Sequence, residues 1–271
     1  MILAVIGTGN MGQALIKGFV RQNLLQPADV RLYDADAEKC VAFARTINAR
    51  ACPDAESSVV DADIVLLAVK PQVIEPAINA IGKSMKPGAL LLSIAAGITL
   101  ERLRSLAGPD LALARVMPNT PAMVGSGVSA VCFDRASLEQ QNQVHVLLAS
   151  CGMVFELSEK LFDAVTGLSG SGPAYVMMMI EAMADAGVKL GLTRDISIHM
   201  AAMTLMGSAR MVLETGTHPA VLKDQVCSPG GTTIEAVTRL EEDGLRASLI
   251  HAVCTAAEKS RQMREQAGEH G

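Results

Sequence analysis

The chain has 271 residues, of which 50% are hydrophobic, 19% are charged and 3% are aromatic, and its formal net charge is −5 at pH 7. This length suffices for one large domain or two ordinary ones, and the apolar fraction predicts a globular protein with a sizeable buried core. Nucleic-acid binding is disfavoured, because the acidic balance offers no basic stripe for phosphates and the few aromatic residues offer no platform for stacked bases.

Short apolar runs bounded by Gly, Pro or Asp fill the chain up to about residue 160 and predict strands. Several of these runs lack polar alternation, which indicates a sheet covered on both faces, as in a parallel, doubly wound α/β fold. The predicted strands are residues 2–7, 30–34, 63–69, 89–96, 111–117, 127–133 and 153–158.

The first predicted strand leads into the run GTGNMG, which places Gly7, Gly9 and Gly12 at the start of a helix. The next strand ends at Asp34, and the whole set matches the dinucleotide-binding fingerprint. In that pattern Gly7 permits a tight turn, Gly9 lets a pyrophosphate approach the backbone, and Gly12 lets the helix pack closely on the strand. The alternative is glycines that only make a turn. We therefore predict a Rossmann-type domain at residues 1–160, with loop contacts to the nucleotide from Gly7, Thr8, Gly9, Asn10, Met11 and Gly12.

The acidic residue Asp34 bears on the choice of nucleotide. It is placed to accept hydrogen bonds from the adenosine ribose, and its charge would repel a 2′-phosphate. Asp36 and Glu38 follow it and no arginine comes directly after it, so the sequence leans towards NADH over NADPH. Alternatively, Asp34 caps the next helix.

Two later strand ends are expected to border the same crevice, because ligands of open parallel sheets lie outside the carboxyl ends of the strands. Each of these strands ends in small residues. Lys70 could instead be a solvated turn residue. The residues predicted to line the nicotinamide side are Ala68, Val69, Lys70, Pro71, Ala95, Ala96 and Gly97.

Residues 161–271 contain helical patterns only, with breaks near 167–173, 191–195, 215–219, 228–231 and 242–244. We predict an all-helical second domain over this range. Its apolar run at 176–190 is interrupted by Glu181 and Asp185, which argues against a membrane span. A helix that is apolar on nearly every side must be covered on nearly every side, so we infer an oligomer. The alternative is a helix at the centre of its own domain.

A second candidate anion site lies in the run SPGGTT at residues 228–233. Thr232 and Glu235 have the spacing of a capping box, which predicts that a helix begins here. Gly230 and Gly231 leave the backbone bare enough for a ligand to reach its N–H groups. A carboxylate would fit, so we expect a small anionic substrate. The alternative is an ordinary capped helix joint.

Metal-site and disulfide patterns are missing from the sequence. The six cysteines include no CxxC pair, and no two histidines stand four residues apart. We therefore expect no metal and no disulfide framework. With no basic start or long apolar run at its beginning, the chain is expected to be cytoplasmic.

Beyond these patterns, blocks along nearly the whole chain resemble pyrroline-5-carboxylate reductases. They include GTGNMGQALIKGF, AVKPQ, SIAAGI, RVMPNTPAMVGSG and LKDQVCSPGGTTIEAVTRLEEDGLRASLIHAV. The resemblance implies hydride transfer from NAD(P)H to the ring imine of Δ1-pyrroline-5-carboxylate, which gives L-proline. It also implies that NADPH is commonly accepted, which opposes the leaning of Asp34 towards NADH. It also implies a homodimer through the helical domain, with assembly into a higher homo-oligomer left open.

The same resemblance implies where the substrate binds. Its carboxylate would be held by Ser228, Gly230, Gly231, Thr232 and Thr233, with Thr233 as the catalytic residue that hydrogen-bonds the ring nitrogen or its proton. Gln225 and Glu156 would border the substrate.

Two other functions compete with this prediction. A hydroxyacid dehydrogenase of the 6-phosphogluconate dehydrogenase type would also join a Rossmann domain to a helical one. It would need a lysine and an asparagine on the first long helix of the second domain, and the run GPAYVMMMIEAMADAG has neither. A non-catalytic nucleotide-sensing protein would have no use for the hydroxyl-lined SPGGTT run.

Overall fold

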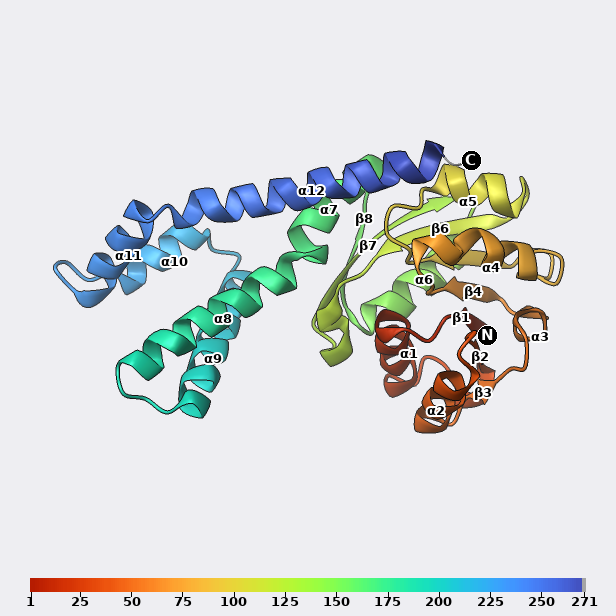
Figure 1. Cartoon of the computed structure of the whole chain (residues 1–271), viewed down its shortest axis with the longest axis horizontal. Coiled ribbons are helices and arrows are strands. Elements are labelled where there is room, and N and C mark those ends of the chain that lie inside the picture. The colour runs from red at the N-terminus through yellow and green to blue at the C-terminus, as the bar shows by residue number, and fades with distance from the viewer. Residues whose placement is uncertain (270–271) are drawn as a thin grey trace. The chain divides into compact units, whose positions relative to one another are not determined.

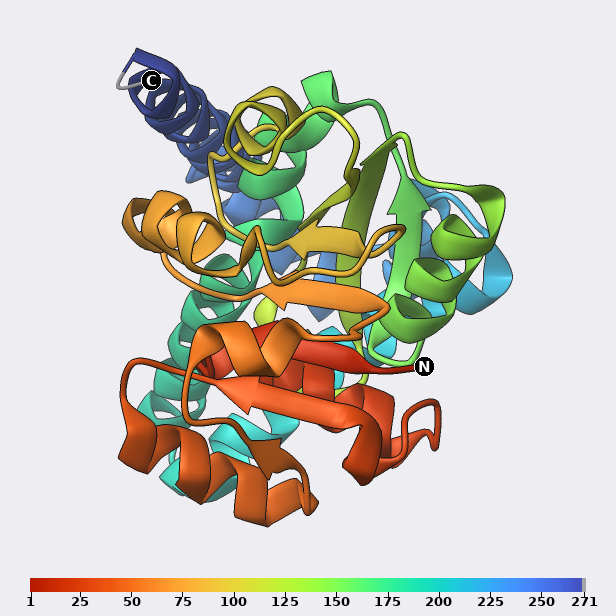
Figure 2. The ribbon, with the colours of Figure 1, turned by 90° about the vertical axis from the view of Figure 1, so that its right-hand side faces the viewer.

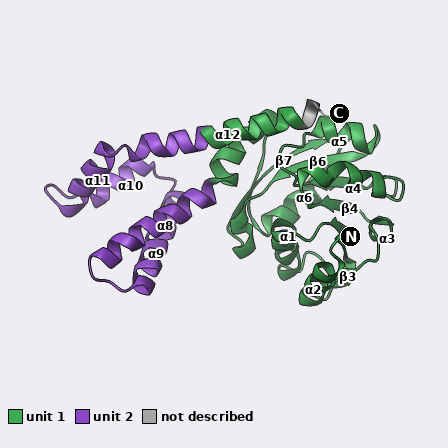
Figure 3. Ribbon diagram, viewed as in Figure 1, with its two compact units in different colours: residues 1–171, 255–271 green, residues 172–254 purple. Residues whose placement is uncertain are grey.

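The computed structural model describes residues 1–269, with side chains up to residue 266. It divides into two compact units (Figure 3). The larger unit comprises residues 1–171 and the chain from Thr255 onward, and the helical unit comprises residues 172–254. The predicted division into functional domains at residue 160 stays a prediction.

An eight-stranded sheet forms the larger unit (Figure 1). Its order is β3-β2-β1-β4-β5-β6-β7-β8, which confirms the predicted doubly wound fold. All seven predicted strands are present, and the short β3 was missed. The bounds are β1 Leu3–Ile6, β2 Val30–Tyr33, β3 Arg50–Ala51, β4 Ile64–Leu67, β5 Leu90–Ser93, β6 Ala112–Met117, β7 Gly127–Asp134 and β8 Gly152–Glu156.

One pairing departs from the expected parallel arrangement, because β7 runs antiparallel to β6. A parallel crossover needs a dozen or more residues and usually a helix. Residues 118–126 supply only the short 3-10 helix η3, Thr120–Val124, between the two strands. The chain therefore turns back beside β6 at this edge.

Helices cover both faces of the sheet (Figure 2). Along β1, Leu3 and Val5 join one buried cluster while Ala4 and Ile6 join the other, as expected for a strand whose side chains alternate between two covered faces. One cluster lies under α1, α2 and α6, and the other under α3, α4 and α5. The bounds are α1 Asn10–Arg21, α2 Ala37–Ile47, α3 Ala55–Val59, α4 Ile74–Ile81, α5 Leu100–Ala107, α6 Leu138–Ala149 and α7 Phe162–Val165.

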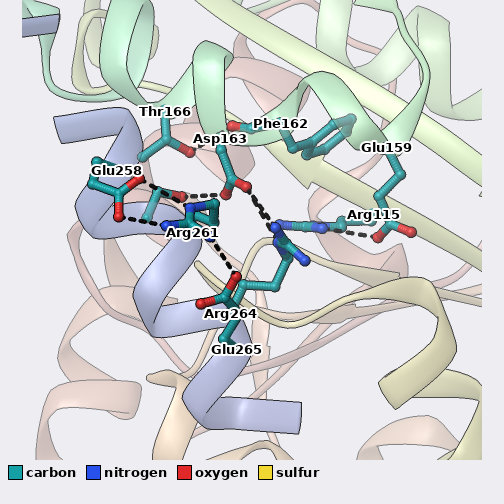
Figure 4. A network of polar contacts seen from close by, with 10 residues as sticks. Arg115, Glu159, Phe162, Asp163, Thr166, Glu258, Arg261, Arg264 and Glu265 are labelled. Atoms are coloured by element: carbon teal, nitrogen blue, oxygen red, sulfur yellow. Dashed lines mark hydrogen bonds and ion pairs between the residues drawn. The ribbon is translucent and has the colours of Figure 1, made fainter. Parts of the chain in front are cut away.

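A polar network attaches the end of the last helix, α12 (Leu245–Glu269), to helix α7 of the larger unit (Figure 4). Asp163 in α7 accepts hydrogen bonds from the Ser260 hydroxyl at 2.8 Å and from the Arg264 guanidinium at 3.1 and 3.2 Å. Beside it, the buried Arg115 of β6 donates to Glu159 at 2.8 Å. The C-terminal turns of α12 thus belong to the larger unit.

The helical unit consists of helices only, and the predicted breaks near 191–195, 215–219, 228–231 and 242–244 are confirmed. In the break predicted near 167–173 only Ser171 is outside a helix, because a π-helix covers Thr166–Gly170 and α8 begins at Gly172. Its first two helices pack closely, because a Cβ on Gly187 would lie 2.6 Å from the Ser197 hydroxyl oxygen. The bounds are α8 Gly172–Lys189, α9 Arg194–Thr215, α10 Pro219–Val226 and α11 Thr232–Glu242, followed by the first part of α12.

Few side chains of the helical unit are buried. Between residues 172 and 254, all of which are described, the buried ones are Ala184, Ser197 and Ala201. By length and composition alone α9 could cross a membrane, because an 18-residue window of it has a mean hydropathy of 1.3, and 11% of that window is buried. Large apolar side chains on α8 and α9 are exposed, among them Met177 (62%), Met178 (69%), Met203 (59%) and Met206 (57%).

Candidate active site

The glycine loop between β1 and α1 has the geometry that the sequence predicts. Gly7 has a φ of +98°, and a Cβ there would lie 2.7 Å from the Ala68 carbonyl oxygen and 2.8 Å from a Val69 methyl. A Cβ on Gly12 would lie 2.9 Å from that of Ala68, so close packing of α1 on β4 requires glycine. Gly9 differs, because the nearest atom to its Cβ position is the Ala68 oxygen at 3.9 Å. The backbone at Gly9 is therefore open to a ligand.

A cleft of about 400 Å³ lies next to this loop. Gly7 and Gly9 line it, together with Asp34 from the end of β2 and the predicted strand-end residues Ala68, Val69 and Lys70. The first turn of α1 contains Asn10, which is exposed, and Met11, which is half-buried. The structure thus brings six of the fourteen predicted nucleotide residues into the lining of one cleft.

Hydrogen bonds from Thr8 and Asp36 fix the carboxylate of Asp34. Its Oδ2 accepts from the Thr8 backbone N–H at 2.6 Å and from the Thr8 hydroxyl at 2.8 Å, and its Oδ1 accepts from the Asp36 N–H at 3.0 Å. The alternative role of Asp34 as a helix cap is wrong, because Asp36 is the N-cap of α2 and accepts from the Lys39 N–H. Its carboxylate instead faces the loop and the cleft.

Burial by itself would raise the pKa of Asp34. The hydrogen bonds from Thr8 and Asp36 and the charge of Lys39 outweigh this effect, so the pKa of Asp34 lies below its ordinary value. The cleft therefore contains a carboxylate that is ionised at neutral pH.

Sequence reasoning missed Lys39, which lines the same cleft with its Nζ 3.6 Å from Asp34 Oδ2. The signal was available, because Lys39 stands three residues after the N-cap Asp36. The first turn of a helix that follows a strand directly lies beside the end of that strand.

The remaining predicted strand-end residues do not line this cleft. Pro71 and Ala96 line a second cavity of about 630 Å³ between α4, α5 and the end of α12. Ala95 is buried, and Gly97 has a φ of +78° with its Cβ position 3.7 Å from the Arg264 nitrogen in α12. Only part of the predicted nicotinamide side therefore lies in the nucleotide cleft.

In the helical unit, the run at 228–231 forms a tight turn. The Gly231 N–H donates to the Ser228 carbonyl at 3.0 Å, and Gly230 has a φ of +66°. Pro229 followed by a glycine with positive φ is typical of a type II turn. A Cβ on Gly231 would collide with the Ser228 hydroxyl oxygen, so a side chain there would force Ser228 to change its rotamer.

The predicted start of α11 at Thr232 is confirmed, but the predicted capping box is wrong. Gly231 is the N-cap, with an extended backbone (φ −84°, ψ 170°) and no side-chain cap. An N-cap side chain acts only from an extended residue that precedes the helix, and Thr232 is already helical. Among the described residues, none forms a hydrogen bond with the hydroxyls of Thr232 and Thr233.

The helices α1 and α11 therefore begin in the same way, with an extended glycine and no side-chain cap. Such a start leaves the first N–H groups without a protein partner and places partial positive charge next to them. Other helices have a side-chain cap at this position, as with Asp36 for α2, Thr99 for α5, Ser137 for α6 and Thr193 for α9.

The other predicted substrate residues lie in different units. Gln225 is exposed in the last turn of α10, a few residues before the 228–231 turn. Glu156 is at the end of β8 in the larger unit, and its carboxylate lies 3.1 Å from the His145 Nε2. The structure thus gathers Gln225 with the loop residues in the helical unit and places Glu156 in the larger unit.

Within residues 1–269, no group of three or more His, Cys, Asp or Glu side chains is arranged to hold a metal ion. The six cysteines are all free, and Cys40, Cys52, Cys132 and Cys151 are buried.

Comparison with known proteins identifies two family models in the chain. One, described as pyrroline-5-carboxylate reductase dimerisation, matches residues 159–263. The other, described as NADP oxidoreductase coenzyme F420-dependent, matches residues 2–97.

Similar proteins cover nearly the whole chain. A pyrroline-5-carboxylate reductase from Escherichia coli is 42% identical over 96% of this chain and 97% of its own length, and one from Glycine max is 41% identical over 96% and 95%. The crystal structure of a Plasmodium falciparum pyrroline carboxylate reductase with NADP bound superposes with a TM-score of 0.89 at 32% identity, over 97% of this chain and 98% of that one.

Proposed function

The chain belongs to the pyrroline-5-carboxylate reductase family, and from this membership we propose that it reduces Δ1-pyrroline-5-carboxylate to L-proline with NAD(P)H, the last step of proline biosynthesis. The observation that carries the proposal is about 40% identity to reductases of this name over 96% of the chain. The N-termini of α1 and α11, which have no side-chain cap, support the proposal. A dinucleotide and the substrate each carry a negative charge that such an N-terminus can bind.

The cleft beside Gly9 fits a dinucleotide. Its backbone is open at Gly9, α1 begins without a side-chain cap, and Gly7 and Gly12 keep the loop close to β4. We propose that this helix start holds the pyrophosphate and that Ala68, Val69 and Lys70 border the nicotinamide half. When bound, the reduced nicotinamide supplies the hydride.

We further propose a preference for NADH over NADPH. Asp34 is ionised and lines the cleft, so it can accept a hydrogen bond from a ribose hydroxyl and repels a 2′-phosphate. Lys39 lies 3.6 Å from Asp34 and weakens this repulsion, because its positive charge partly neutralises the carboxylate. An opposing point is the relative from Plasmodium falciparum, whose structure holds NADP.

The substrate carboxylate is assigned to the start of α11. The N–H groups of its first turn and the hydroxyls of Ser228, Thr232 and Thr233 are donors that no described side chain engages. A carboxylate at an uncapped helix start gains both hydrogen bonds and the favourable end of the helix dipole. Gln225 and Glu156 are proposed to border the substrate ring.

Little acid or base chemistry is required of the protein, because a protonated cyclic imine is already electrophilic. The main contribution of the chain is to fix the ring in position against the nucleotide. The Thr233 hydroxyl is proposed to hydrogen-bond the ring nitrogen or its proton, which stabilises the nitrogen as its charge changes during reduction.

We propose that the active form is a homodimer in which the helical units cover each other. The exposed methionines of α8 and α9 support this proposal, as does the dimerisation family model over residues 159–263. A second copy would also cover α9, whose apolar surface would otherwise be exposed to water.

A cytoplasmic location is proposed on two grounds. All six cysteines are free, which is typical of reducing compartments. A similar reductase also comes from a bacterium, Escherichia coli.

The alternatives make different predictions in one assay. The loss of reduced-nicotinamide absorbance is followed with Δ1-pyrroline-5-carboxylate, separately with NADH and with NADPH. Substrate-dependent oxidation that yields proline is the expected result. Cofactor binding without turnover would favour a nucleotide-sensing protein, and turnover only with a hydroxyacid would favour a dehydrogenase of the 6-phosphogluconate dehydrogenase type.

A further inference from the structure

Thr8, the residue between the first two glycines of the loop, is fully buried. The sequence predicts that it contacts the nucleotide, but all its polar groups are bound within the protein. Its N–H and hydroxyl both donate to Asp34 Oδ2, at 2.6 and 2.8 Å, and its carbonyl accepts from the Gln13 side chain at 2.9 Å. Any influence of Thr8 on the nucleotide must therefore act through Asp34.

The two bonds from Thr8 meet at one oxygen of the carboxylate. Oδ2 also lies 3.6 Å from the Lys39 Nζ, whereas among the described residues Oδ1 accepts only from the Asp36 N–H, at 3.0 Å. An ionised carboxylate has about four acceptor positions, two on each oxygen. Oδ1 therefore keeps a free acceptor position at the end of β2, where the adenosine ribose of a dinucleotide binds.

From this arrangement we infer that the Thr8 hydroxyl is a positioning group for nucleotide selection. By anchoring Oδ2, it fixes the plane of the Asp34 carboxylate and keeps Oδ1 directed to a ribose 2′-hydroxyl. The hydroxyl thereby raises the affinity for NADH relative to NADPH. The inference rests on the proposed function only in that the cleft binds a nicotinamide dinucleotide.

The backbone supports this role. The Gly7 N–H donates to the Tyr33 carbonyl at 2.8 Å, so the phosphate loop and the end of β2 are joined at two successive residues, 7 and 8. The Thr8 N–H holds Asp34 near the loop in any variant. The hydroxyl adds the second bond, which prevents the carboxylate from rotating about the first.

The test compares Thr8→Val with the wild type. Valine has nearly the same shape as threonine but no hydroxyl. Dissociation constants for NADH and NADPH are measured by nicotinamide fluorescence on the full chain without substrate. We expect the NADH constant to rise about tenfold and the NADPH constant to change less than twofold, on the scale of one hydrogen bond to a charged group. Thr8→Ser, which keeps the hydroxyl, should retain the wild-type ratio.

The same exchange at Thr46 is the control, because its hydroxyl donates to the Phe43 carbonyl at 2.7 Å within α2, and neither residue lines the cleft. If Thr8→Val does not fold, Thr8→Ala replaces it. Equal weakening of both nucleotides, or an unchanged ratio, would overturn the inference. Because no substrate is used, a wild type that binds dinucleotides without reducing pyrroline-5-carboxylate would overturn the proposed function alone.

Discussion

The larger unit has buried clusters on both faces of its sheet, whereas from residue 172 to 254 only Ala184, Ser197 and Ala201 are buried. The difference shows that the larger unit can be held by its own core, while the helical unit needs a surface from elsewhere to cover its methionines. The same difference in burial is found between α1 and α11, the two helices that begin with an uncapped glycine. Helix α1 packs Leu15, Ile16 and other buried residues on the sheet, but α11 has none.

The largest expected effect concerns the less buried of these two sites. Thr233→Ala should lower turnover by about ten- to a thousandfold, the scale of removing one hydrogen bond aimed at a developing charge. Steady-state kinetics with saturating nucleotide measure it. The control is Thr238→Ala on the same helix, whose hydroxyl donates to the Ile234 carbonyl at 3.0 Å. Unchanged turnover in Thr233→Ala would reject the catalytic role.

A second substitution examines the buried site. Gly7→Ala should weaken nucleotide binding by about a hundredfold, because its Cβ meets the Ala68 carbonyl at 2.7 Å and its φ is +98°. Gly88→Ala is the matched control, with a φ of +79° but nothing within 4 Å of the new Cβ. Binding constants from fluorescence titration should separate the overlap from the backbone strain. Equal effects of the two variants would contradict the geometric account.

A third change tests whether a second copy covers the helical unit. Met203 is 59% exposed on α9, and Met203→Asp should raise the dimer dissociation constant at least about tenfold, since a buried methionine contributes roughly 1.5–3 kcal/mol. Sedimentation velocity over a range of concentrations measures this constant. Val60→Asp, at an exposed apolar position of the larger unit, should leave it unchanged. A Met203→Asp chain that stays dimeric at all concentrations would exclude this surface.

The smallest effect is expected where α12 meets the larger unit. Asp163→Asn should reduce the free energy of unfolding by about 1–2 kcal/mol, because the bonds from Arg264 and Ser260 lose their charged acceptor. Urea unfolding measures the change. Arg261→Gln breaks only exposed pairs with Glu258 and Glu265 and should cost less than about 0.5 kcal/mol. If the two variants were equally stable, the network in Figure 4 would not anchor the helix.

Much of the fold was predictable from local patterns. Uninterrupted apolar runs located seven strands, and the spacing of Gly7, Gly9, Gly12 and Asp34 located the nucleotide cleft. The reversal of β7 was not predictable from the runs themselves, because a strand covered on both faces has the same composition in either direction. The two-residue β3 is too short to produce any pattern.

The prediction of the site was wrong at the N-cap of α11. Thr232 and Glu235 have the spacing of a capping box, but the turn closed by Gly231 takes the N-cap position first. The bonds between Thr8 and Asp34 join residues 26 positions apart, and no periodicity reports such a contact. The substrate residues Ser228, Thr232, Thr233, Gln225 and Glu156 came from the family resemblance, and their roles stay predictions.

Because α12 returns to the larger unit, the helical unit is an insertion within it, as the colours of Figure 3 show. The chain leaves the larger unit after residue 171 and rejoins it at residue 255, so both ends of the insertion are attached to the same unit. Removal of the chain from residue 255 onward would take Ser260 and Arg264 away from Asp163. Such a truncation would therefore reach the larger unit as well as the helical one.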